Sequence, residues 1–237
     1  MEVNRRRTVQ LAGASLSSIV LAGCLSAADP ESGDDSDDSG DTDGSDPTGE
    51  PGDRNRDLPR FDDPPYEITE PECAEAKDRD PLWLCENMMT EPSVEFDQVE
   101  TSSAIFADEG LRVDEQQGDD QYYATFLTEA GDRDRLHDGA SGSAVKLIEK
   151  TNFDTEAVLV AQTGWGSGSE TPHLKRIEGV NDGIHAFGCY RRPCIVTSDQ
   201  TVRTVVSRFA RPASLDRSMV SLTVDPETRV NIGVRDW

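Results

Sequence analysis

Positive charge is scarce in this sequence, and lysine is the scarcest of its charged residues. The 237 residues contain 47 aspartates and glutamates against 23 lysines and arginines, which gives a formal net charge of −24. The four lysines are Lys77, Lys146, Lys150 and Lys175. A chain this acidic repels phosphate groups, so we expect neither nucleic acid nor an anionic membrane surface among its partners.

An excess of acid with few lysines resembles the composition of proteins from extreme halophiles, haloarchaea in particular. The physical reason is screening, because the Debye length falls to about 3 Å in molar salt. Charge repulsion within the fold is then tolerated, and the acidic surface keeps the protein hydrated. We therefore predict a salt-adapted protein that folds poorly at low salt.

Motifs for catalysis and cofactor binding are missing as well. The sequence has no Gly-x-Ser-x-Gly nucleophile elbow, no Gly-x-x-x-x-Gly-Lys phosphate loop and no dinucleotide fingerprint after a strand. Its three histidines, His137, His173 and His185, are not spaced so that two of them would share one face of a helix or strand. We therefore predict a protein without enzymatic activity, cofactor or metal.

The first 23 residues lack an apolar run of comfortable membrane-spanning length, and they follow the order of a signal peptide. Arginines at 5–7 precede a moderately apolar run at 9–22, which is shorter than the ~20 residues of a span. Residues 21–24 read Leu-Ala-Gly-Cys, which resembles a lipobox at every position. The paired arginines resemble a Tat export signal. We predict a signal peptide at 1–23 and lipidation of Cys24, with a soluble cleaved signal or an uncleaved short anchor as alternatives.

Residues 24–57 are predicted to form a disordered acidic tether behind the lipidated cysteine. From Ser26 onward the segment contains Asp, Gly, Ser, Thr, Pro and Glu with almost nothing apolar. Such a segment cannot bury enough surface to offset its chain entropy. Residues 41–46 resemble half of a calcium loop, but Gly52 stands where such a loop needs glutamate, so a solvated linker is the better interpretation.

Four cysteines follow the predicted lipidation site: Cys73, Cys85, Cys189 and Cys194. An even number of cysteines outside the cytoplasm favours two disulfides. Three connectivities are possible, and local pairing of Cys73 with Cys85 and of Cys189 with Cys194 is our prediction. A four-cysteine zinc site is the alternative, but it would have short Cys-x2–4-Cys knuckles in pairs, which these spacings do not provide.

Strand and turn signals divide the remainder into a loop-rich part at 58–120 and a β-sandwich core at 121–237. In the first part, the apolar residues 82–84 are expected to pack on the core, and short strands are predicted at 102–107 and 111–113. In the core, residues 144–150 are predicted to form one short helix, with Val145 and Ile148 facing inward, and 164–169 a flexible Gly/Ser loop. The predicted core strands are 121–128, 157–161, 173–180, 184–190, 201–209, 219–224 and 229–234. This pattern predicts a mainly β fold, an antiparallel sandwich or open barrel.

Residues 120–235 resemble a loosely defined set of haloarchaeal surface lipoproteins of unknown function. The likeness depends on Phe153-Asp154 before the strand at 158–162, on the Gly/Ser loop, and on a strand that ends in Arg191-Arg192-Pro193. Residues 120–235 also resemble, more faintly, a β-sandwich accessory domain of a dentilisin-type surface protease complex. Neither likeness assigns catalytic residues to this chain.

Three residues are candidates for recognition. Trp165 lies in the Gly/Ser loop, and an aromatic on a loop can anchor an interface. Arg191 and Arg192 form a rare basic spot, which would bind an anionic partner or pair with local acids. The sequence as a whole favours a membrane-anchored, extracytoplasmic lipoprotein that binds a protein or envelope partner or has a structural role. The alternatives are an accessory subunit of a surface hydrolase or protease complex and a surface metal or redox protein.

Overall fold

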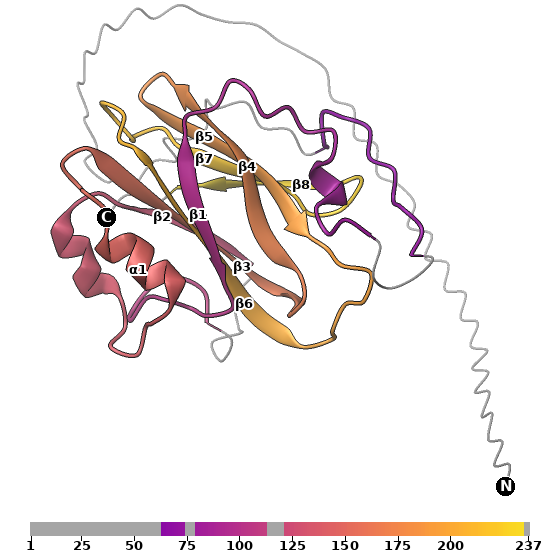
Figure 1. Ribbon diagram of the computed structural model, residues 1–237, viewed down its shortest axis with the longest axis horizontal. Coiled ribbons are helices and arrows are strands. Elements are labelled where there is room, and N and C mark those ends of the chain that lie inside the picture. The colour runs from indigo at the N-terminus through magenta and orange to yellow at the C-terminus, as the bar shows by residue number, and fades with distance from the viewer. Residues whose placement is uncertain (1–62, 74–78, 113–120, 235–237) are drawn as a thin grey trace, which may run out of the picture. The chain divides into compact units, whose positions relative to one another are not determined.

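A computed structural model of the chain describes residues 63–73, 79–112 and 121–234 (Figure 1). The predictions for the signal peptide, for Cys24 and for the acidic tether lie outside these residues. The described part is a mainly β fold in which two four-stranded sheets pack face to face, with one short α-helix. The sandwich predicted from the sequence is therefore confirmed.

Strands β1, β2, β3 and β6 form one sheet, and β4, β5, β7 and β8 form the other. Sheet I contains, in spatial order, β1 (Phe96–Thr101), β6 (Gln200–Ala210), β3 (Glu156–Ser167) and β2 (Tyr122–Leu127). Sheet II contains β4 (Thr171–Val180), β5 (Gly183–Arg191), β7 (Met219–Thr223) and β8 (Arg229–Gly233). All neighbours are antiparallel except β5 and β7, which are parallel because the chain leaves sheet II for β6 between them.

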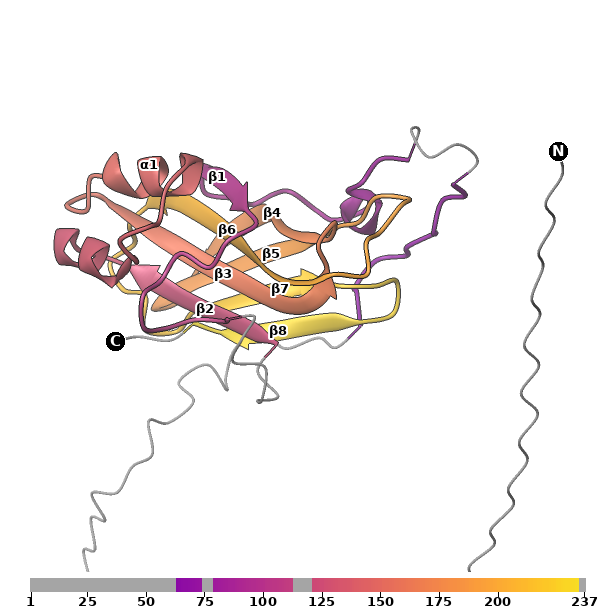
Figure 2. The ribbon, with the colours of Figure 1, turned by 90° about the horizontal axis from the view of Figure 1, so that it is seen from below.

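Alternation along the strands fills the space between the sheets and also buries the outer face of sheet I. On β3, Ala157, Leu159 and Ala161 belong to the central core, whereas Val158 and Val160 face the other way. The outward residues are covered by α1 (Ser143–Glu149), by residues 102–112 and by Leu136, which follows the 3-10 helix η2 (Ala130–Arg135). Helix α1 lies against β1 and β6 (Figure 2). A second apolar cluster therefore seals this face.

The loop over sheet I is fixed by one buried amide. The side-chain carbonyl of Gln162 accepts from the backbone N–H of Leu111 at 2.8 Å, and its NH2 group donates to Thr204 at 3.2 Å. Gly110 adopts a φ of +81°, and a Cβ there would lie 2.2 Å from the Gln162 oxygen. Glycine is thus required at position 110 both by backbone conformation and by the close approach.

The outer face of sheet II is covered by the segment that precedes β1. The 3-10 helix η1 (Trp83–Cys85) is buried, which confirms that residues 82–84 pack on the core. The hydroxyl of Tyr66 donates to the carbonyl of Leu84 at 3.2 Å and lies 2.8 Å from the hydroxyl of Thr223. The Trp83 indole N–H donates to the carbonyl of Arg192 at 3.2 Å.

Two disulfides join this segment to β5 and to the connection that follows β5, and their pairing differs from the local pairing that we predicted. Cys85 is bonded to Cys189, and Cys73 to Cys194. Local pairing was wrong because η1 lies on β5, which brings Cys85 beside Cys189 rather than beside Cys73. Cys85 and Cys189 are fully buried, whereas Cys73 is exposed. Two disulfides indicate an extracytoplasmic protein.

The core strands match the prediction closely, and the loop-rich part does not. Each of the seven strands predicted between 121 and 234 coincides with one of β2 to β8. The prediction of a flexible loop at 164–169 was wrong in part. Strand β3 continues to Ser167 and contains Gly164 and Gly166, with a bulge between Thr163 and Gly166. Residues 102–107 and the described residues 111–112 form no named strand, and β1 instead spans Phe96–Thr101. On α1, Ile148 is buried as predicted, but Ala144 rather than Val145 accompanies it.

Candidate functional site

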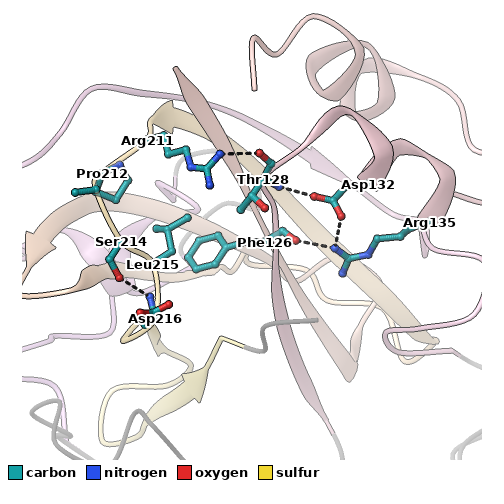
Figure 3. A pocket seen from close by; sticks show the side chains of 10 residues that line it. Phe126, Thr128, Asp132, Arg135, Arg211, Pro212, Ser214, Leu215 and Asp216 are labelled. Atoms are coloured by element: carbon teal, nitrogen blue, oxygen red, sulfur yellow. Dashed lines mark hydrogen bonds and ion pairs between the residues drawn. The ribbon is translucent and has the colours of Figure 1, made fainter. Parts of the chain in front are cut away.

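The candidate site is a pocket at the end of the sandwich where β2 and β6 finish. Its volume is about 320 Å³, at the low end for a small-molecule site. Ten residues line it, drawn from the end of β2, from η2 and from the connection between β6 and β7: Phe126, Thr128, Asp132, Arg135, Arg211, Pro212, Ala213, Ser214, Leu215 and Asp216 (Figure 3). These segments are up to 90 residues apart in sequence, so only folding assembles the pocket.

One wall of the pocket is formed by Arg135, whose guanidinium is engaged by neighbouring protein groups. The Arg135 guanidinium makes two contacts with the Glu109 carboxylate, at 2.6 and 3.0 Å, and donates to the carbonyl of Phe126 at 2.8 Å. It also pairs with Asp132 at 3.2 Å. Burial lowers the pKa of Arg135, but these carboxylates raise it further, so the net shift is upward and the charge is permanent. This arginine holds the wall rather than offering a donor to a ligand.

The opposite wall carries Arg211, whose guanidinium uses one of its terminal nitrogens in hydrogen bonds to the described residues. Arg211 is exposed, and one of its terminal nitrogens donates to the backbone carbonyls of Thr128 at 3.0 Å and Phe153 at 3.5 Å. No carboxylate pairs with it among the residues that the structure describes. Figure 3 shows its guanidinium directed at Thr128, across the pocket from Arg135.

The floor and rim complete a mixed surface. The Phe126 ring and Leu215 provide apolar contact and belong to or pack against the core. The Ser214 hydroxyl accepts from the backbone N–H of Asp216 at 3.1 Å, which fixes the rim of the β6–β7 connection (Figure 3). With a guanidinium, carboxylates and an aromatic ring but no cysteine or histidine, the lining residues can hold a small polar ligand by hydrogen bonds and lack a nucleophile paired with a base.

The two arginines singled out in the sequence are paired with acids rather than free. Arg191 pairs with Glu100 at 3.2 Å, and Arg192 pairs with Glu170 at 2.7 Å. Trp165, the third candidate, lies within β3, and its side chain lies outside the described residues. None of the three lines the pocket.

Glu100 is the centre of a polar cluster where β1 meets β4. It accepts from His173 Nδ1 at 2.7 Å and from Thr171 at 3.2 Å in addition to Arg191. Burial raises its pKa, but the hydrogen bond from His173 and the charge of Arg191 outweigh burial and lower the pKa overall. The neighbouring Gln98 side chain donates to Leu174 and accepts from its N–H, at 2.8 and 3.0 Å. The cluster thus closes this edge of the sandwich.

A hydroxyl–imidazole pair that the sequence analysis missed lies on the outer face of sheet II. His185 Nε2 is 2.7 Å from the Ser221 hydroxyl, which donates to Asn231 Oδ1 at 2.7 Å. Because the single hydroxyl hydrogen is given to Asn231, the imidazole N–H must be the donor to Ser221, so it does not act as a base toward it. His185 and Ser221 are also buried, at 4% and 1% exposure. Their alternation within strands was the only available signal, and it does not predict cross-strand pairing.

Within residues 63–73, 79–112 and 121–234, no group of three or more His, Cys, Asp or Glu side chains is placed to hold a metal ion. No helix in these same ranges has the length and apolarity to cross a membrane. Comparison with family models, with curated proteins and with solved structures yields no match to this chain.

Proposed function

We propose that this protein is a lipid-anchored, extracytoplasmic binding module of a salt-adapted cell. In this proposal Cys24 carries the lipid, residues 24–57 form the tether, and the sandwich presents its end pocket to a small polar ligand or to a partner in the cell envelope. The observation that carries the proposal is the pair of long-range disulfides, with sequence separations of 104 and 121, which join the segment before β1 to β5 and to the connection after β5. Such bridges persist in oxidising compartments.

The binding role is supported by the composition of the pocket. Arg211 leaves donors available, and the remaining lining residues offer hydrogen bonds and an apolar floor without a nucleophile and base in contact. A module of this kind would bind without turnover. We therefore propose a non-enzymatic role.

The anchor is tested by expression of the full chain in a haloarchaeal host, followed by cell fractionation and mass spectrometry of the N-terminal peptide. We expect the wild type in the membrane fraction, beginning at a lipid-modified Cys24. Cys24→Ala should leave that fraction or retain its signal peptide, whereas Ser26→Ala, a matched change two residues away, should behave as the wild type. An intact N-terminus on protein recovered from the cytosol would contradict the proposal.

A further inference from the structure

The outer face of sheet II buries more positive charge than negative. Arg229, at the start of β8, is 4% exposed, and no carboxylate pairs with it in the part of the chain that the structure describes. Arg176 on β4 pairs with Glu178 at 3.1 Å. Because Glu178 pairs with Arg176 and no carboxylate pairs with Arg229 in the described residues, the two arginines carry an excess of one positive charge. This is unexpected in a chain with twice as many acids as bases.

Both arginines reach from the edge strands of sheet II toward its middle. The guanidinium carbon of Arg176 lies 4.2 Å from the centre of the Phe187 ring, and that of Arg229 lies 5.3 Å from the same centre. The His185 ring stacks on Phe187 with 3.9 Å between ring centres. Two cations therefore contact one aromatic ring. Burial lowers the pKa of His185, and the charges of Arg229 and Arg176 lower it further. Cation–π contact offsets only part of the desolvation.

The neighbouring groups do not neutralise Arg229. Strand register places Cys189 and Thr223 in the same cross-strand row, and Ser221 and Asn231 in the next. Besides Arg176, the ionisable group that acts on Arg229 among the described residues is Tyr66. Burial raises the pKa of its phenol above the ordinary value despite the nearby arginines, so it stays neutral and donates to Leu84. A buried guanidinium without a counter-charge carries a large desolvation penalty.

We propose that a small inorganic anion of the size of chloride binds in this cluster, held by Arg229 together with Arg176. One negative charge would balance the excess. The high burial of His185, Ser221 and Arg229 favours a single ion over a larger oxyanion or metabolite. The inference is independent of the end pocket and of the lipid anchor.

The test is chloride-35 NMR line broadening on the folded full-length protein, in high salt made up with gluconate. We expect broadening that saturates with chloride in the wild type, is several-fold weaker in Arg229→Met, and is partly restored in Arg229→Lys. Arg208→Met is the matched control, because Arg208 is paired with Asp97 and with Glu156 on sheet I. Equal broadening in the wild type and Arg229→Met would overturn the proposal.

A second measurement covers the case in which Arg229→Met does not fold. The thermal midpoint of the wild type is recorded at constant ionic strength while chloride is replaced by gluconate. We expect the midpoint to fall as chloride is withdrawn, because an ion that binds only the folded state stabilises it by mass action. A midpoint that does not change with chloride would equally reject the site.

Discussion

The outer faces of the two sheets are buried in different ways. Sheet I is covered by segments near its own strands in sequence, and the contacts are apolar: Ile148 and Phe153 pack on Val158 and Val206. Sheet II is covered by a distant segment, and its face carries arginines, a histidine and hydroxyls. Apolar burial stabilises a cover directly, whereas polar burial costs desolvation that other interactions must offset. The disulfides lie on the polar face, where this offset is needed.

The largest expected effect comes from opening the buried bridge with Cys85→Ala and Cys189→Ala. While the other bridge is intact, this one closes a short loop, the 12 residue steps from 73 to 85 and the 5 from 189 to 194. Chain entropy for a loop of that size is about 3 kcal/mol, and lost packing of two buried sulfurs brings the total to about 4 kcal/mol. Denaturant unfolding in high salt measures the loss.

The double change Cys73→Ala and Cys194→Ala is its matched control. It opens the same loop but removes an exposed cysteine and a half-buried one, so we expect about 3 kcal/mol from closure alone. An equal or greater loss for this pair would mean that packing around Cys85 contributes nothing to the cover of sheet II.

Ile148→Ala should destabilise the apolar cover of sheet I by about 3 kcal/mol. The side chain is fully buried in the second cluster, and its truncation leaves a cavity between α1 and the sheet. Val145→Ala on the same helix, where the side chain is half buried, should cost clearly less. Thermal unfolding of both variants measures the difference, and a similar loss for the two would contradict the idea that α1 is held by one apolar stripe.

Protonation of His185, on the outer face of sheet II, should destabilise the folded protein. Burial and then the charges of Arg229 and Arg176 lower its pKa from 6.5 to about 4. The unfolded chain therefore binds the proton first, so stability is constant above pH 6.5 and falls as the pH drops toward 4, by about 2 kcal/mol at pH 5. The measurement is unfolding free energy between pH 8 and 4 for the wild type and His185→Gln. Parallel curves for the two would exclude His185 as the source.

The sequence predicts the strands of the core well because each has a strong local signal, such as the apolar run at 157–161. It fails where the outcome depends on contacts between distant segments. In strand β1, Asp97 and Glu100 obscure the alternation of apolar and polar residues. These acids pair with Arg208 and His173, which are distant in sequence and come close only in the fold. The disulfide pairing and the end pocket were not predicted for the same reason, since both depend on contacts between segments that no local sequence pattern relates.

The smallest effect is expected at the hydroxyl that fastens the cover to sheet II. Tyr66→Phe removes the hydrogen bonds to Leu84 and Thr223 but keeps the ring, so we expect a loss of about 1 kcal/mol. A double-mutant cycle with Thr223→Val separates the bond from the ring, because the second change should cost less once the first is present. Coupling well above zero in this cycle would show that the polar cover depends on single hydrogen bonds as well as on its disulfides. Additive losses would instead indicate that the disulfides, rather than this hydrogen bond, hold the covering segment on sheet II. The cover of sheet II would then be attached covalently, and the cover of sheet I by apolar packing.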